Sequence, residues 1–175
     1  FQVGVLKAIN EWVQQKEIPF KVIAGTSAGS INAAYLAANA DDFNSAVETM
    51  VSMWGNLTTN KVYKSHLISI NHVKTLMNVF NQLRKGLDKT NSILNALPLA
   101  KLLNDQIQFD RIQYCLNKGY INSLAITATN FQHSMSTTFV QSNQTINWER
   151  VRRAGKYEKI KVKHLMASTA IPFLF

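Results

Sequence analysis

The sequence is poor in the residues that build disulfide frameworks and metal sites. Cys115 is its only cysteine, which excludes an internal disulfide, and its helical surroundings predict a buried structural thiol. The four histidines and 10 acidic residues form no His/Cys or His/Asp cluster with metal-ligand spacing. We therefore expect no metal site.

Long apolar runs are also absent. No stretch approaches the length of a membrane span, and the first residues do not read as a signal peptide. This favours a location in the cytoplasm or peripherally at a membrane. Secretion stays open, because the chain begins at Phe1, stops on an apolar run at Phe175 and looks cut at both ends. Its 175 residues match one domain, and 46% hydrophobic residues against 17% charged ones indicate a globular protein with a core.

Negative charge is scarce: 10 Asp and Glu stand against 19 Lys and Arg, for a net charge of +9. An excess of this size can indicate nucleic acid, an anionic membrane surface, or only a solvated face. Nucleic acid is disfavoured, because no aromatic platform or recognised binding motif accompanies the basic residues. They are densest in what we call the basic run, which comprises Arg150, Arg152, Arg153, Lys156, Lys159, Lys161 and Lys163.

Hydrophobic periodicity predicts an α/β domain. Helices are expected over residues 1–16, 28–40, 41–55, 73–83, 91–104, around Cys115 as far as Gly119, and over 164–170. Strands are expected over residues 21–24 and 123–129, with 136–140 as a hairpin partner of the second. The segment 21–24 lacks polar alternation, which is typical of a parallel strand covered on both faces. Helices mixed with strands indicate a single layered domain.

The most informative motif lies at the junction of the first strand with the next helix. Gly25-Thr26-Ser27-Ala28-Gly29 matches G-x-S-x-G, the nucleophile elbow, in which a sharp turn lifts a serine hydroxyl clear of the sheet. A side chain at either glycine is expected to clash across this turn. The N–H of Ala28 and the helix dipole would face an oxyanion that develops on a substrate. The pattern predicts that Ser27 is a nucleophile.

Two further segments, together with this motif, resemble parts of a known family. Residues 1–40, the strand 125–130 and the segment Met166-Ala167-Ser168-Thr169-Ala170-Ile171-Pro172 resemble the patatin-like phospholipase family, the last through its A-S-x-A-I-P motif. The resemblance implies a three-layer α/β/α sandwich with a mainly parallel central sheet. It also implies a lipid acyl hydrolase that needs no cofactor, acts on phospholipid or another acyl lipid, and uses a Ser-Asp dyad.

Two parts of the family pattern are missing. The family aspartate belongs to an Asp-Gly motif, and no Asp-Gly pair occurs here; the glycine-rich oxyanion loop expected ahead of Phe1 is absent too. We therefore expect residues 1–175 to be a single partial domain, incomplete at both ends and inactive alone. The acids read as helix caps or surface positions: Asp41, Asp42, Asp88, Asp105 and Asp110. No sequence feature links the histidines to the serine; they are His66, His72, His133 and His164. His164 is interpreted as a surface or helix-start residue.

Three alternatives stay open. The chain could be an ordinary α/β-hydrolase whose Ser-His-Asp partners lie downstream. It could be a non-catalytic lipid-binding module that retains the serine without its acid. It could also be a basic nucleic-acid-binding protein, which would leave the elbow unexplained.

Overall fold

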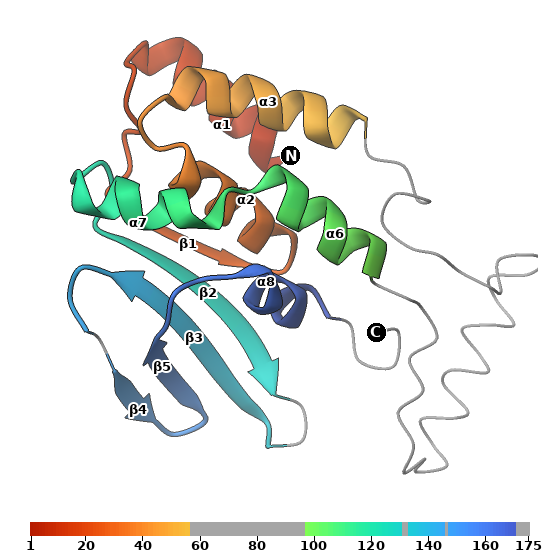
Figure 1. Ribbon diagram of the computed structural model, residues 1–175, viewed down its shortest axis with the longest axis vertical. Coiled ribbons are helices and arrows are strands. Elements are labelled where there is room, and N and C mark those ends of the chain that lie inside the picture. The colour runs from red at the N-terminus through yellow and green to blue at the C-terminus, as the bar shows by residue number, and fades with distance from the viewer. Residues whose placement is uncertain (57–96, 131–132, 146, 171–175) are drawn as a thin grey trace, which may run out of the picture.

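The computed structural model describes residues 1–56, 97–130, 133–145 and 147–170 (Figure 1). The predicted helix at 73–83, together with His66, His72 and Asp88, lies outside these residues. The helices are α1 (Gln2–Val13), α2 (Ala28–Ala38), α3 (Phe43–Gly55), α6 (Leu97–Gln106), α7 (Phe109–Asn117) and α8 (Val162–Thr169). The strands are β1 (Val22–Thr26), β2 (Ser123–Asn130), β3 (Met135–Ser142), β4 (Trp148–Arg150) and β5 (Arg153–Tyr157).

Helix boundaries follow local capping chemistry. The Asp42 carboxylate accepts a hydrogen bond from the Ser45 N–H at 3.0 Å and so caps α3, as its position predicts. Beyond α7, Gly119 adopts φ 75°, the left-handed conformation that commonly ends a helix. Cys115 on α7 is fully buried, which confirms the predicted burial of its thiol. None of the helices in the described ranges is long and apolar enough to cross a membrane.

The sheet is mixed rather than mainly parallel. Its strand order is β1-β2-β3-β5-β4; β1 with β2 and β3 with β5 are parallel, whereas β2 with β3 and β4 with β5 are antiparallel. The physical reason is connection length, because strands joined by a short turn can only pair antiparallel. The hairpin predicted between residues 123–129 and 136–140 is confirmed as β2 and β3. Strands β4 and β5 are not predicted from the sequence, because charged residues dominate these segments.

One face of the sheet carries the core. Ile23, Leu124 and Ile126 are buried on the face against which α2 packs, and nine of the eleven α2 residues are buried. The small side chains of α2 let it approach the strands closely. On the opposite face Val22 is 65% exposed and Ala24 is also exposed, so β1, which is the first strand in the sheet order, is covered on one face only.

This arrangement corrects the expectation of a strand covered on both faces. In Figure 1 the helices lie over one side of the sheet, and the strand contacts of α2, α7 and α8 are all made there. Within the described residues, the helices that contact the sheet thus cover one of its faces, and a helical layer on the other face, which a three-layer sandwich requires, is not among them.

Candidate active site

The candidate site is centred on the junction of β1 and α2. Ser27 stands between the last strand residue and the first helical residue, with φ 54° and ψ −130°. Non-glycine residues rarely adopt positive φ, and holding one there costs about 1–3 kcal/mol. Ser27 and Ala28 are both exposed. The strained turn therefore presents the Ser27 hydroxyl to solvent at the amino end of a helix, as a nucleophile elbow requires.

The two flanking glycines have different roles. A Cβ atom at Gly25 would overlap the Gly29 carbonyl oxygen and lie 2.7 Å from the Ser30 Cα. Because those atoms are backbone, they cannot move aside, so Gly25 is required for the close approach of strand and helix. A Cβ atom at Gly29 would meet only the Gln2 side chain, at 3.4 Å or more. The expectation that both glycines are needed to avoid a clash is therefore wrong for Gly29.

The carbonyl side of the elbow is anchored by α2 itself. The Ser27 carbonyl oxygen accepts hydrogen bonds from the Ser30 N–H at 2.8 Å and from the Ser30 hydroxyl at 2.6 Å. Ser30 is fully buried, so this anchor is shielded from water. Ala28 opens the helix, and its N–H is one of the first-turn amides that have no partner within a helix. That amide is available for a negatively charged oxygen.

The amide side of the elbow is held by a residue 141 positions away. The Ser27 N–H donates to the Ser168 hydroxyl oxygen at 2.8 Å, and this hydroxyl donates to the Thr127 carbonyl oxygen at 2.6 Å. Ser168 thus links α8, the elbow and β2. The sequence identified Ser168 only as part of a family motif and gave it no role; the motif itself was the available signal.

His164 is not arranged to act on Ser27. It is buried rather than at the surface, its Nδ1 accepts the Lys161 N–H at 2.9 Å, and its Nε2 lies 2.9 Å from Glu158 Oε2. Both ring nitrogens are therefore engaged. Burial lowers the His164 pKa below its usual value, against the opposing effect of the Glu158 carboxylate. His133 is exposed in the turn between β2 and β3.

The described acidic residues also have other functions. Asp41 accepts two hydrogen bonds from the Arg111 guanidinium at 2.6 and 2.7 Å, in an ion pair between the end of α2 and α7. Asp42 caps α3, and Asp105 and Asp110 are exposed. Over the described ranges, neither an acid nor a histidine hydrogen bonds to Ser27. Nor, within those ranges, do three or more His, Cys, Asp or Glu side chains gather where they could hold a metal ion.

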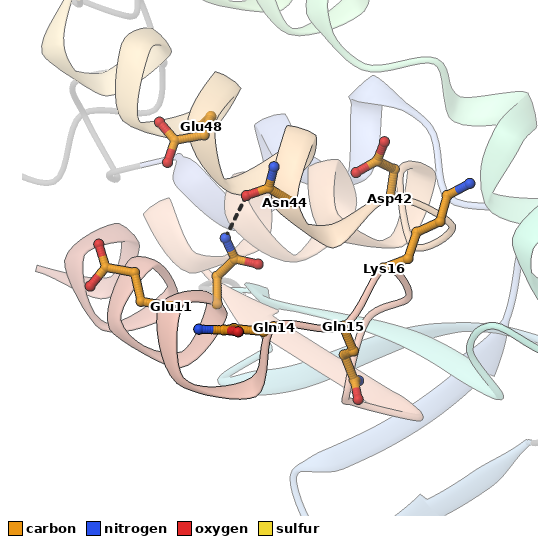
Figure 2. A pocket seen from close by; sticks show the side chains of 8 residues that line it. Glu11, Gln14, Gln15, Lys16, Asp42, Asn44 and Glu48 are labelled. Atoms are coloured by element: carbon orange, nitrogen blue, oxygen red, sulfur yellow. Dashed lines mark hydrogen bonds between the residues drawn. The ribbon is translucent and has the colours of Figure 1, made fainter.

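A polar pocket lies elsewhere in the molecule. Figure 2 shows it between α1, the loop that follows α1, and α3, with the Asn10 amide donating to Asn44 Oδ1 at 2.8 Å. This pocket flanks the segment before β1, whereas Ser27 follows the carboxyl end of β1. Ligands of open α/β sheets bind beyond the carboxyl ends of the strands, so the pocket is not part of the candidate site.

Comparison with known proteins agrees with the elbow geometry. No curated protein and no solved structure matches the chain. A family model described as patatin-like phospholipase matches residues 1–175, the whole of the sequence. The chain therefore belongs to the patatin-like phospholipase family.

Proposed function

We propose that Ser27 is the nucleophile of a lipid acyl hydrolase of the phospholipase A or esterase type. Membership of the family implies lipid acyl hydrolysis and lipid substrates. The observation that carries the proposal is the strained, exposed serine between β1 and α2. Strain of this kind persists where the surrounding structure maintains it, and here hydrogen bonds anchor both sides of Ser27.

The reaction would proceed through an acyl-enzyme. The Ser27 oxygen forms a bond to the ester carbonyl carbon, its proton passes to a base, and the carbonyl oxygen becomes an oxyanion. Collapse of this intermediate breaks the bond to the alcohol portion of the lipid, which leaves with the proton. Water then attacks the acyl-serine in the same manner and releases the fatty acid.

The Ala28 N–H is the proposed oxyanion donor. The Ser27 N–H donates to Ser168, so it is already occupied and is poorly placed to serve a substrate. The amide of Ala28 is at the first position of α2, where the helix dipole adds to its attraction for negative charge. Removing one such donor typically costs 10²- to 10³-fold in kcat, an effect of about 3–4 kcal/mol.

The base would be an aspartate from an Asp-Gly motif outside residues 1–175. Two observations support this assignment: the sequence has no Asp-Gly pair, and the described acids serve as caps, ion-pair partners or surface residues. The engaged ring of His164 speaks against the Ser-His-Asp alternative for that residue. We accordingly propose that residues 1–175 form a partial domain and are inactive when isolated.

A fluorophosphonate probe tests the nucleophile in the full-length protein. We expect labelling at Ser27, and loss of both labelling and ester hydrolysis in Ser27→Ala. Ser134→Ala is the matched control, because Ser134 is also exposed and also has positive φ, at 47°, but belongs to the turn before β3. Turnover that survives Ser27→Ala would refute the proposal. A Ser27 that stays unlabelled in a folded protein that still binds lipid would favour the non-catalytic module.

The base is tested separately by removing every histidine of the segment. A folded full-length variant with His66, His72, His133 and His164 all changed to glutamine should keep activity within a few-fold of the parent, since the dyad needs no imidazole. Changing the downstream Asp-Gly aspartate to asparagine should abolish activity. If the histidine variant folds but is inactive, the triad replaces the dyad.

A further inference from the structure

The turn between β4 and β5 exposes an apolar side chain at its tip. Val151 is 91% exposed and is followed by Arg152, which has φ 61°. Tight turns usually carry glycine, asparagine, aspartate or proline, so a fully exposed valine is not explained by turn chemistry. Behind it, Trp148 covers Gly155, and the Arg150 guanidinium lies 5.8 Å from the centre of the Trp148 ring.

Positive charge surrounds this tip on the open face of the sheet. Arg150 pairs with Arg153 across the hairpin, and paired residues of neighbouring strands point to the same face. That face is the one opposite the helices, because Glu149 and its partner Ala154 occupy the other. Glu149 is the only acid of the hairpin. Over the described ranges, Arg150, Arg152 and Arg153 are exposed and form no ion pair.

The tip of the hairpin and Ser27 lie at the same end of the sheet, the end at which β1 finishes. Thr26, the residue before Ser27, is aligned through β2 and β3 with Gly155, two residues after Arg153 at the start of β5. The carboxyl end of β1 and the β4–β5 turn therefore lie at the same end of the strands, as the strand directions in Figure 1 also show. Three strand spacings, about 14 Å, separate β1 from β5. A flat surface that contacts the turn would thus lie close to the elbow.

We propose that the β4–β5 hairpin docks on an anionic phospholipid bilayer and turns the Ser27 edge toward it. The choice of a bilayer as the partner rests on the proposed function, because a lipid hydrolase must meet its substrate at a bilayer. Val151 enters the headgroup region, and the three arginines bind lipid phosphate and carboxylate groups. Each cation near such a surface strengthens binding about five-fold at low salt, and the attraction falls off within a Debye length, about 8 Å at physiological salt.

Vesicle binding by the full-length protein tests the hairpin. Vesicles of mixed phosphatidylcholine and phosphatidylserine are compared with vesicles of phosphatidylcholine alone. Arg152→Gln with Arg153→Gln should weaken binding to the anionic vesicles about 25-fold, the product of two five-fold losses. Val151→Ser, which keeps every charge, should weaken binding less and in a manner less sensitive to salt. Both positions are exposed, so the variants should fold.

The matched control removes two positive charges elsewhere. Lys7 on α1 and Lys16 in the following loop are exposed, and changing both to glutamine gives the same change in net charge away from the hairpin. An equal loss of vesicle binding in this control would overturn the proposal, because only net charge would then matter. Unchanged vesicle binding in the hairpin variants would overturn it too, as would weakened binding to duplex DNA or RNA with vesicle binding unaffected.

Hydrolysis of a soluble ester separates the two proposals. We expect the hairpin variants to cleave it at the parental rate, since the hairpin does not touch the elbow. If the hairpin variants lose vesicle binding as expected but Ser27 proves not to be a nucleophile, the proposed function fails and the docking surface stands. If Ser27 is the nucleophile and the hairpin has no effect on vesicle binding, only the docking surface fails.

Discussion

Replacing Ser168 with alanine removes one oxygen atom that makes two hydrogen bonds at the elbow. That oxygen accepts from the Ser27 N–H at 2.8 Å and donates to the Thr127 carbonyl at 2.6 Å. Each such bond contributes about 0.5–1.5 kcal/mol net, so their joint loss should lower the free energy of unfolding by about 1–3 kcal/mol. The elbow is partly exposed, and water can replace some of the lost bonding, which places the expected value in the lower half of that range.

The larger effect should be on catalysis. Without the Ser168 hydroxyl, nothing in the described contacts holds the amide side of Ser27 at its strained φ, and the serine can relax away from its reactive position. A displacement of about 1 Å of a reacting group can cost 10²-fold in rate. We therefore expect kcat toward a soluble ester to fall about 10- to 100-fold with KM little changed. The assay is steady-state hydrolysis by the full-length protein, alongside denaturant unfolding.

Two companion variants decide whether this reasoning holds. Ser168→Thr keeps the hydroxyl and should restore most of the activity. Thr169→Ala removes a neighbouring hydroxyl that donates to the carbonyls of Leu165 and Met166 within α8, and so perturbs the same helix without touching the elbow. If Ser168→Ala retains the parental kcat, or if Thr169→Ala loses as much activity, then Ser168 does not position the nucleophile.

Two more predictions concern the elbow glycines and the buried histidine. Gly25→Ala should abolish activity and sharply reduce soluble yield, because the added Cβ would overlap the backbone of Gly29. Gly29→Ala should retain activity within a few-fold, because its Cβ would meet only the Gln2 side chain. Equal tolerance of both changes would contradict the geometry. Burial lowers the His164 pKa in the folded protein. In the unfolded chain this histidine has its ordinary pKa of about 6.5, so below that pH the unfolded chain binds more protons than the folded one. Stability is therefore complete above that pH and falls as the pH drops below it, also because a protonated Nδ1 cannot accept the Lys161 N–H. Urea unfolding at neutral and mildly acidic pH should show this loss, and His164→Gln should flatten it; an equally steep pH dependence in that variant would place the titrating group elsewhere.

Local features of the site could be predicted from the sequence. The residues that force the turn are contiguous, and a strand followed by a helix rich in small residues can be recognised from a short window. Gly25, Ser27 and Ala28 therefore occupy the positions that the G-x-S-x-G pattern predicts. The cap at Asp42 and the helix end near Gly119 are equally local, since each depends on a few neighbouring residues.

Features that depend on partners distant in the sequence could not be predicted in this way. An apolar segment predicts a buried strand but does not show which elements cover each of its faces, so the expectation that β1 is covered on both faces is wrong for the face that carries Val22. The sequence predicts a surface or helix-start position for His164; the residue does lie in the first turn of α8, but the packing of α8 on the sheet buries it beside Phe139. Gly29 can accept an added Cβ where Gly25 cannot, because the atoms that this Cβ would meet belong to the Gln2 side chain of α1 and not to the backbone.

By itself, the sequence indicated the family and the position of the nucleophile elbow, because the G-x-S-x-G pattern and the strand and helix on either side of it are adjacent in the chain. Tertiary structure decided what surrounds that elbow. It brought Ser168 to the Ser27 amide across 141 positions and aligned the β4–β5 turn with the edge that carries Ser27. These contacts depend on strand order and direction, which are set by the packing of the whole sheet against its helices.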